Sequence, residues 1–173
     1  MDNILLVRPN KELESQAIEY KLKHLEYGEN TISGSEMWDK TDDYNAWTET
    51  ITRNADKYTV NPNWVVTDTF FAIRESDNKI VGMISFRHEL NDFLKDFGHS
   101  GYSIRPTERK KGYATEMLKQ ILGIAKQNGL KYMQLSCEKD NIPSVRTIVK
   151  NVGIYERSFE FNGEPTDIFM VTL

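Results

Sequence analysis

The stretch GYSIRPTERKKGYATEML, residues Gly101–Leu118, changes from strand-like to helix-like character within a few residues. Residues Gly101–Ile104 alternate polar and apolar side chains, which predicts a half-buried strand. Pro106 ends that strand because it lacks the N–H group that a sheet ladder needs. A basic turn leads to Gly112, and beyond it the apolar residues recur at helical spacing: Ala114, Met117, Leu118, Ile121, Leu122 and Ala125. The stretch therefore predicts a strand, a tight basic turn and an amphipathic helix.

The basic turn has the chemistry of an anion-binding site. The first four N–H groups of a helix have no partner inside the helix, and the peptide dipoles leave partial positive charge at that end. A phosphate group fits such a terminus. Gly112 has no Cβ and lets a phosphate approach the backbone, while Arg109, Lys110 and Lys111 add attraction for a polyanion. The alternative is an ordinary strand–helix turn whose basic residues are solvated.

The motif Arg109-x-x-Gly112-x-Ala114, set between a strand and a helix, resembles motif A of the GNAT acyltransferases. Three segments also resemble a group of bacterial GNAT-like acetyltransferases: HELND at His88–Asp92, RPxxRxxGYA at Arg105–Ala114 and DNxxS at Asp140–Ser144. The resemblance extends from Val7 to the C-terminus. It implies an α/β (α+β) GNAT fold, with a mixed, mostly antiparallel sheet and about four flanking helices. In that fold the sheet splays into a V between the motif A strand and the next strand.

The rest of the chain supplies the elements that such a fold needs. Short apolar runs predict strands at 4–7, 69–74, 80–89, 132–137, 154–161 and 167–173, and periodic stretches predict helices at 11–27, 44–56 and 141–151. Loose apolar faces are expected at Leu13, Ala17, Tyr20 and Leu25 in the first helix, and at Val145, Ile148, Val149 and Val152 in the last. The length fits one GNAT acyltransferase domain, residues 1–173.

Composition excludes several classes of function. The net charge of −4 argues against a general nucleic-acid binder. There is no run of about 18 apolar residues, and Met1–Arg8 lacks the layout of a signal peptide, so we expect no membrane partner. The single cysteine, Cys137, fits a reducing compartment, and we expect a cytoplasmic protein. Three scattered histidines and one cysteine predict no metal site.

The resemblance to GNAT acyltransferases implies acetyl-CoA as the cofactor and assigns residues to it. The end of the motif A strand would pair through its backbone with the pantetheine amides: Ser103, Ile104 and Arg105. Backbone amides of the turn, assisted by the Thr115 hydroxyl, would hold the pyrophosphate: Arg109, Lys110, Lys111, Gly112, Tyr113 and Ala114. Asn141 would contact the pantetheine arm, and Ser144 would lie near the diphosphate. Asn141 also suits a helix cap, and one residue can serve in both roles.

The proton donor and the base are left open. Many GNATs carry a tyrosine seven residues after that asparagine, where Ile148 stands here. Tyr155 is a candidate general acid, although an aromatic strand residue more often packs in a core, and water is another proton source for the leaving thiolate. Glu89 is the candidate general base at the end of the strand before motif A, with the histidines at 88 and 99 as alternatives. Cys137 is a candidate nucleophile, but its alternation with apolar neighbours favours core packing.

The acceptor pocket is expected from two loops, Glu26–Asp43 and Asn91–Gly98. The first is acidic, which would suit a cationic amine, although charged loops are usually solvated surface. The sequence thus predicts an N-acetyltransferase in which a primary amine of a small molecule or peptide attacks acetyl-CoA directly. A non-catalytic acyl-CoA-binding module is the alternative, and Ile148 favours it. A nucleotide-phosphate binder is disfavoured because no G-K-[ST] motif occurs. The final hairpin, expected to be exposed, would allow a homodimer.

Overall fold

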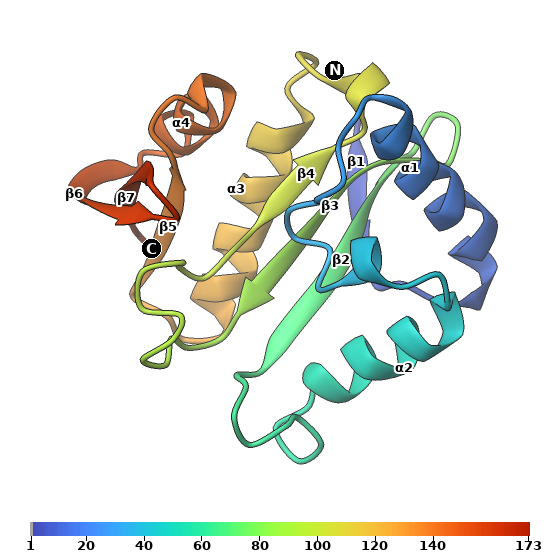
Figure 1. The fold of residues 1–173 in the computed structure, drawn as a ribbon, viewed down its shortest axis with the longest axis horizontal. Helices are drawn as coiled ribbons and strands as arrows, with labels where there is room; N and C mark the ends of the chain where they lie inside the picture. Colours follow the sequence, from blue (N-terminus) through green and yellow to red (C-terminus); the bar gives the residue numbers. More distant parts are fainter. Residues whose placement is uncertain (1) are drawn as a thin grey trace.

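The β-sheet at the centre of the fold is split into two parts, as Figure 1 shows for this computed structural model, which describes residues 2–173. The first part runs in the order β1 (Ile4–Val7), β2 (Thr67–Arg74), β3 (Lys79–Arg87) and β4 (Tyr102–Ile104). The second runs in the order β5 (Tyr132–Glu138), β7 (Glu164–Thr172) and β6 (Ile154–Phe161). All named pairs are antiparallel, and within residues 2–173 β4 and β5 do not pair. The gap between β4 and β5, called the V below, confirms the predicted splay.

The two parts of the sheet touch just before β4. Gly98 forms an isolated antiparallel bridge with Leu135 of β5, and the N–H of His99 donates to the Gln134 carbonyl at 2.8 Å. Gly98 has a φ of +80°, and a Cβ there would lie 2.5 Å from the Gln134 oxygen, so this position requires glycine. The V is therefore closed at the start of β4 and opens towards its end.

Within the described part of the chain, four α-helices cover the sheet: α1 (Glu14–Glu26), α2 (Tyr44–Asn54), α3 (Tyr113–Gln127) and α4 (Ile142–Lys150). One hydrophobic cluster packs α3 against one face of the four-stranded sheet. A second packs α1 and α2 against the opposite face (Figure 1). The helices thus sandwich the four-stranded part, as expected for elements that each bury one apolar face.

The predicted core face of α3 is confirmed, whereas two other predicted helix faces are partly wrong. Leu25 of α1 is 44% exposed, and the buried positions on that helix are Ala17, Tyr20, Lys21 and His24. Lys21 and His24 can be buried because carboxylates of following loops, Asp42 and Glu29, accept their hydrogen bonds. In the last predicted helix, Val149 and Val152 are exposed.

Strand boundaries differ from the sequence prediction at one place that matters for the site. β3 ends at Arg87, whereas the predicted strand extended to Glu89. At its end, the N–H of His88 donates to Val66 rather than to a sheet partner. None of the helices in residues 2–173 combines the length and apolar character that a membrane span needs.

Candidate functional site

The N-terminus of α3 lies directly after β4, at the open end of the V (Figure 1). A 3₁₀ turn, Pro106–Glu108, leads to the basic residues. Gly112 then caps α3 with a φ of +89°, and among residues 2–173 no side chain hydrogen-bonds to the helix start. The first N–H groups of α3 are therefore free to receive an anion, and the absence of a Cβ on Gly112 leaves the backbone accessible. This geometry fits the pyrophosphate that the sequence predicts there.

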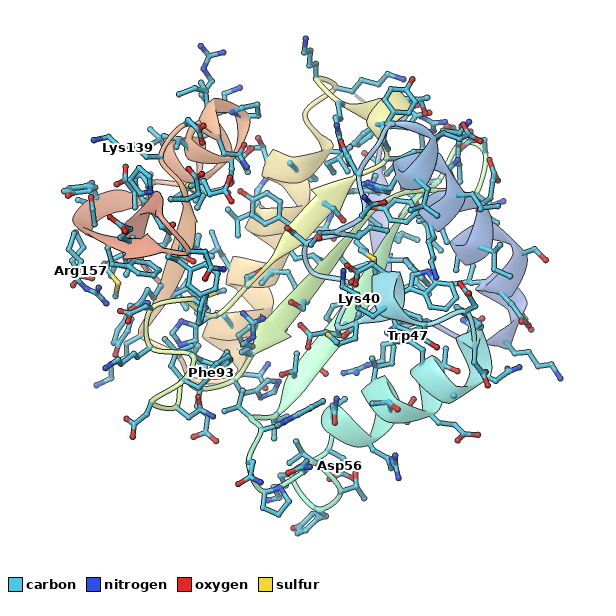
Figure 2. The ribbon with its side chains drawn as sticks, in the orientation of Figure 1. Lys40, Trp47, Asp56, Phe93, Lys139 and Arg157 are labelled. Atoms are coloured by element: carbon cyan, nitrogen blue, oxygen red, sulfur yellow. The ribbon has the colours of Figure 1, made fainter. Side chains whose placement is uncertain are left out.

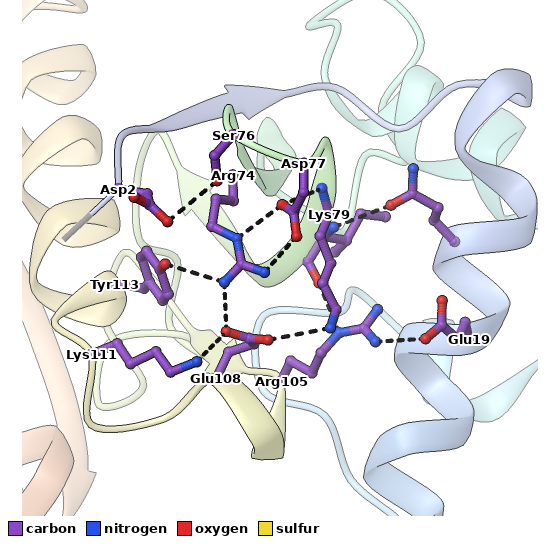
Figure 3. Close-up of polar contacts among 12 residues, drawn as sticks. Asp2, Glu19, Arg74, Ser76, Asp77, Lys79, Arg105, Glu108, Lys111 and Tyr113 are labelled. Carbon is purple, nitrogen blue, oxygen red and sulfur yellow. Dashed lines mark hydrogen bonds and ion pairs between the residues drawn. The ribbon is translucent and has the colours of Figure 1, made fainter.

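The turn before α3 is anchored by Glu108, as Figure 3 shows. Its buried carboxylate accepts hydrogen bonds from Arg74 at 2.7 Å, Lys79 at 3.2 Å and Lys111 at 2.8 Å. Burial alone would raise the pKa of Glu108, but the hydrogen bonds from these three cations outweigh it and lower that pKa to about 2. Arg74 also donates to Asp77 through two nitrogens, at 2.9 and 2.6 Å. The network fixes the turn against the β2–β3 hairpin.

Arg109 is tied to a distant loop. Its guanidinium makes a two-pronged ion pair with Glu29, at 2.6 and 2.7 Å, and Glu29 also contacts the Nδ1 atom of buried His24 at 2.7 Å. The hydrogen bond from Arg109 lowers the pKa of Glu29. Two of the three predicted anion-attracting cations, Arg109 and Lys111, are thus paired with carboxylates, and within residues 2–173 Lys110 makes no ion pair. The predicted attraction for an anion therefore rests mainly on the backbone N–H groups of the turn.

The backbone of β4 has one free edge, and it faces the V. Arg105 donates its N–H to Val81, and Gly101 accepts from Ser85, so the odd-numbered residues turn their backbone towards β3. By the alternation of a strand, Tyr102 and Ile104 present theirs to the V. Of the three predicted pantetheine partners, Ile104 is the one with its backbone aimed into the gap.

The side chains of Ser103 and Arg105 are used in packing against α1. The Ser103 hydroxyl lies 2.9 Å from the Tyr20 hydroxyl. Arg105, 1% exposed, donates to the Ile80 carbonyl and to Glu19, each at 2.9 Å. The contacts with Tyr20 and Glu19 hold β4 against α1, and the bond to the Ile80 carbonyl ties Arg105 to β3.

The far wall of the V is formed by β5 and α4. Asn141 caps α4 by accepting the Ser144 N–H at 3.3 Å, which confirms the cap but does not test contact with a cofactor. The Ser144 hydroxyl lies 2.9 Å from the hydroxyl of Tyr102, so a contact joins β4 to α4. Burial raises the pKa of Tyr102 to about 12, which keeps its hydroxyl protonated at neutral pH. Cys137 is part of the core, and burial raises the pKa of its thiol. Both observations indicate a packing role and not a nucleophile.

The candidate acid and base are not gathered at the V. Tyr155 lies on β6, which β7 separates from β5, and it is exposed with its hydroxyl 2.9 Å from Ser158. At ordinary strand spacing that is about 10 Å from β5. Ile148 is buried in the core, so no hydroxyl replaces it at that position. Glu89 is exposed, two residues beyond the end of β3, so its role as a base stays a prediction.

The two histidines proposed as alternative bases are both engaged in structural contacts. His88 stacks on Phe86 and lies 2.8 Å from Asp68, and His99 accepts the Gln134 N–H at 3.0 Å. Within residues 2–173, no cluster of three or more potential metal ligands occurs.

A cavity of about 520 Å³ lies where the two predicted acceptor loops meet, near Lys40, Trp47 and Phe93 (Figure 2). Both loops contribute to it, but of the residues that the structure describes only one acidic side chain, Glu36, lines the wall. The other acidic residues of the first loop are largely paired, for example Glu29 with Arg109 and Asp42 with Lys21. The expectation that the first loop presents an acidic surface to the acceptor is therefore wrong, because neighbouring cations neutralise its carboxylates.

Sequence reasoning missed Tyr102, and it placed Glu29 and Glu36 only within an acidic loop, without their partners. The first two make contacts between residues 42 and 80 positions apart, which no local pattern encodes. Glu36 stood inside the acidic run and, like its neighbours, it faces a cation, Arg87 at 3.6 Å, so nothing in that run distinguished it.

Comparison with known proteins supplies a family. A family model described as the acetyltransferase (GNAT) domain matches residues 6–153. No protein with a curated description matches the chain.

Solved structures with a similar fold include the microcin C7 self immunity acetyltransferase MccE in complex with acetyl-CoA and AMP, with a TM-score of 0.75 at 16% identity over 100% of this chain and 94% of that one. RimJ of Mycobacterium smegmatis in complex with CoA-disulfide has a TM-score of 0.71 at 14% identity over 98% of this chain and 81% of that one. RimL, a ribosomal alpha-N-protein acetyltransferase in complex with coenzyme A, has a TM-score of 0.70 at 14% identity over 98% of this chain and 94% of that one. At such low identity these likenesses show the fold alone.

Proposed function

Because this chain belongs to the GNAT acetyltransferase family, we propose that it transfers an acetyl group from acetyl-CoA to a primary amine of a small molecule or peptide. The observation that carries the proposal is the V itself: an unpaired β4 edge that leads to an uncovered helix N-terminus. The acetyl-CoA or coenzyme A held by similar structures supports the choice of cofactor. We also propose that the chain is a single domain, because both hydrophobic clusters pack on the same four-stranded sheet.

The proposed cofactor site follows the V from its open end inwards. The backbone amides of Arg109–Ala114 bind the pyrophosphate, with the Thr115 hydroxyl beside them. The backbone of Ile104, flanked by Ser103 and Arg105, pairs with the pantetheine amides. On the opposite wall the amide nitrogen of Asn141 donates to the pantetheine arm, since the cap uses only its oxygen, and Ser144 lies nearby.

The chemistry needs few protein groups. Bound acetyl-CoA supplies a thioester, which a neutral amine can attack directly. The N–H groups on the free edge of β4 are placed to polarise the acyl carbonyl, and the narrow V positions the reacting atoms. The leaving thiolate would take its proton from water, because the phenol that Ser144 holds at the gap, Tyr102, has a pKa raised to about 12 and is a weak acid.

A non-catalytic acyl-CoA-binding module is the second candidate. It is favoured by Ile148, whose buried side chain offers no proton donor on α4, and by the position of Tyr155 away from the V. Such a module would bind acetyl-CoA without releasing thiol.

The experiment that separates the two candidates is thiol release from acetyl-CoA with a panel of primary amines, run beside a thermal-shift titration of acetyl-CoA. Thiol release that depends on an added amine supports the transferase. A thermal shift with no release from any amine supports the binding module. The absence of a thermal shift would contradict both candidates.

A further inference from the structure

The cavity beside the V has walls that are mainly apolar. Trp47 of α2, Trp64 and Val65 before β2, and Phe93 and Leu94 of the β3–β4 connector line it. Phe93 is 76% exposed and Trp64 is 51% exposed, an unusual degree for side chains of this size. A volume of about 520 Å³ is enough for one small molecule or one large side chain.

One end of the cavity reaches the start of β4. Arg87, which lines the cavity, donates from its Nη1 to the Gly98 carbonyl at 2.9 Å, at the junction where the V begins. Gly34 lies so close to β4 that a Cβ on it would be 2.3 Å from the Gly101 oxygen. The loop that carries Glu36 is therefore pressed against the strand that forms one wall of the V.

Glu36 is held at this end by an unusual backbone. Glu36 and its neighbour Met37 both have positive φ, 47° and 72°, and both line the cavity. The indole N–H of Trp47 donates to the carbonyls of Ser35 and Glu36, at 3.1 and 3.0 Å, and so secures the loop. Two consecutive left-handed residues cost stability, so the position of Glu36 is fixed by its surroundings.

The charges on the cavity wall do not suit a polycation. Glu36 is the only carboxylate among the lining residues that the structure describes, and Arg87 lies 3.6 Å from it. Lys40, also on the wall, is paired at 3.3 Å with Asp39, which does not line the cavity. A polyamine or an aminoglycoside would bring several ammonium groups to a wall with one carboxylate and two cations.

We infer that the acceptor is a primary amine whose non-reacting part is apolar and about the size of an aromatic ring, with its ammonium group bound by Glu36. This inference rests on the proposed function and names its substrate class. In the transfer, the bound ammonium first gives one proton to solvent, and the neutral nitrogen then bonds to the acyl carbon. The carbon–sulfur bond breaks with its electron pair on sulfur, the nitrogen gives its second proton to solvent, and the sulfur takes up one proton from solvent. Two kinds of molecule carry such an amine beside a large apolar group: free arylalkylamines, and peptides that begin with a large apolar residue.

The first test compares amines that differ only in their apolar part. Phenylethylamine, ethylamine, spermidine, and tripeptides starting with Phe or Gly are assayed for thiol release from acetyl-CoA. We expect kcat/KM for phenylethylamine or the Phe peptide to exceed that of its small partner by about tenfold or more, as for other apolar pockets. The large acceptor with the higher kcat/KM, phenylethylamine or the Phe tripeptide, shows whether the acceptor is a free arylalkylamine or a peptide. Preference for spermidine or ethylamine would overturn the inference while leaving the transferase function intact.

A second test uses matched variants. Phe93→Ser removes an apolar wall, and Tyr58→Ser changes an exposed aromatic residue that does not line the cavity. We expect Phe93→Ser to lower kcat/KM for the large amine about tenfold and to leave the KM for acetyl-CoA within about twofold. Tyr58→Ser should change neither constant. Equal effects of the two variants would contradict the inference.

A third test does not depend on activity. Two of the three tryptophans, Trp47 and Trp64, line the cavity, so tryptophan fluorescence reports binding. Phenylethylamine, added with or without coenzyme A, should change the fluorescence saturably, spermidine should not, and Trp64→Phe should reduce the signal. If coenzyme A gives no thermal shift, the proposed function fails, and the fluorescence result still decides what the cavity binds. No response to phenylethylamine at millimolar concentration would overturn the inference.

Discussion

Gly112 is the residue on which the proposed pyrophosphate site depends most directly. Replacing it with alanine places a Cβ at the uncovered start of α3 and strains a φ of +89°. We expect Gly112→Ala to weaken coenzyme A binding about tenfold or more in a calorimetric titration. The reason is that an anion must approach these backbone N–H groups closely.

Gly129 provides a matched control at the other end of the same helix. Its φ is +86°, and a Cβ there would meet nothing within 4 Å. Gly129→Ala should therefore cost similar stability, about 1 kcal/mol, without changing the affinity for coenzyme A. If both variants weaken binding equally, the effect comes from destabilised α3 and the anion site is misplaced.

Glu108 should make stability depend on pH. Its pKa is lowered in the folded protein from 4.5 to about 2, so its stabilising effect is complete above pH 4.5 and is lost as the pH falls towards 2. Glu108→Gln should lower the free energy of unfolding by roughly 2–3 kcal/mol at pH 6, measured by urea denaturation, and by clearly less at pH 3.

The control for this prediction is Glu49→Gln, at an exposed position of α2, which should change stability by less than about 0.5 kcal/mol at either pH. A deficit for Glu108→Gln that is the same at pH 6 and pH 3 would show that packing, not charge, explains the role of Glu108.

At the scale of elements, the two suggested roles of Asn141 can be separated. Asn141→Asp keeps the oxygen that caps α4 but loses the amide N–H₂ proposed to donate to the pantetheine arm. We expect Asn141→Asp to retain the melting temperature and to weaken coenzyme A binding. Asn141→Ala should lose both the capping oxygen and the amide donor, so it should weaken coenzyme A binding and also cost about 1 kcal/mol of stability. Unchanged binding by Asn141→Asp would leave Asn141 as a helix cap alone.

The sequence predicted α3 and its turn well because apolar spacing, a strand stop and a glycine all lie within one short stretch. It predicted α1 less well, since burial of Lys21 and His24 depends on partners in later loops. The end of β3 was placed two residues too late because the apolar pattern does not show where the pairing partner stops. Local patterns therefore predicted the strand, the turn and the helix of this segment, whereas contacts between distant segments determine the cavity lined by Trp47, Trp64 and Phe93.

At the scale of the whole molecule, the junction of the two sheet parts both holds the fold together and closes one end of the V. Gly98→Ala would bring a Cβ within 2.5 Å of the Gln134 oxygen at the closed end of the V. We expect a loss of about 2 kcal/mol or more in unfolding free energy, because both the backbone conformation and the bridge are disturbed. A variant as stable as the parent protein would mean that the junction is not needed to hold the two parts together. The homodimer suggested for the final hairpin stays a prediction, to be tested by sedimentation.

The most direct measurement is hydrogen exchange of the whole chain with and without saturating coenzyme A. We expect new protection at the Tyr102 and Ile104 amides of β4, across the first turn of α3, and at the start of α4, because these groups line the V. Protection confined to other segments, or none at millimolar coenzyme A, would contradict the claim that the V is the acetyl-CoA site.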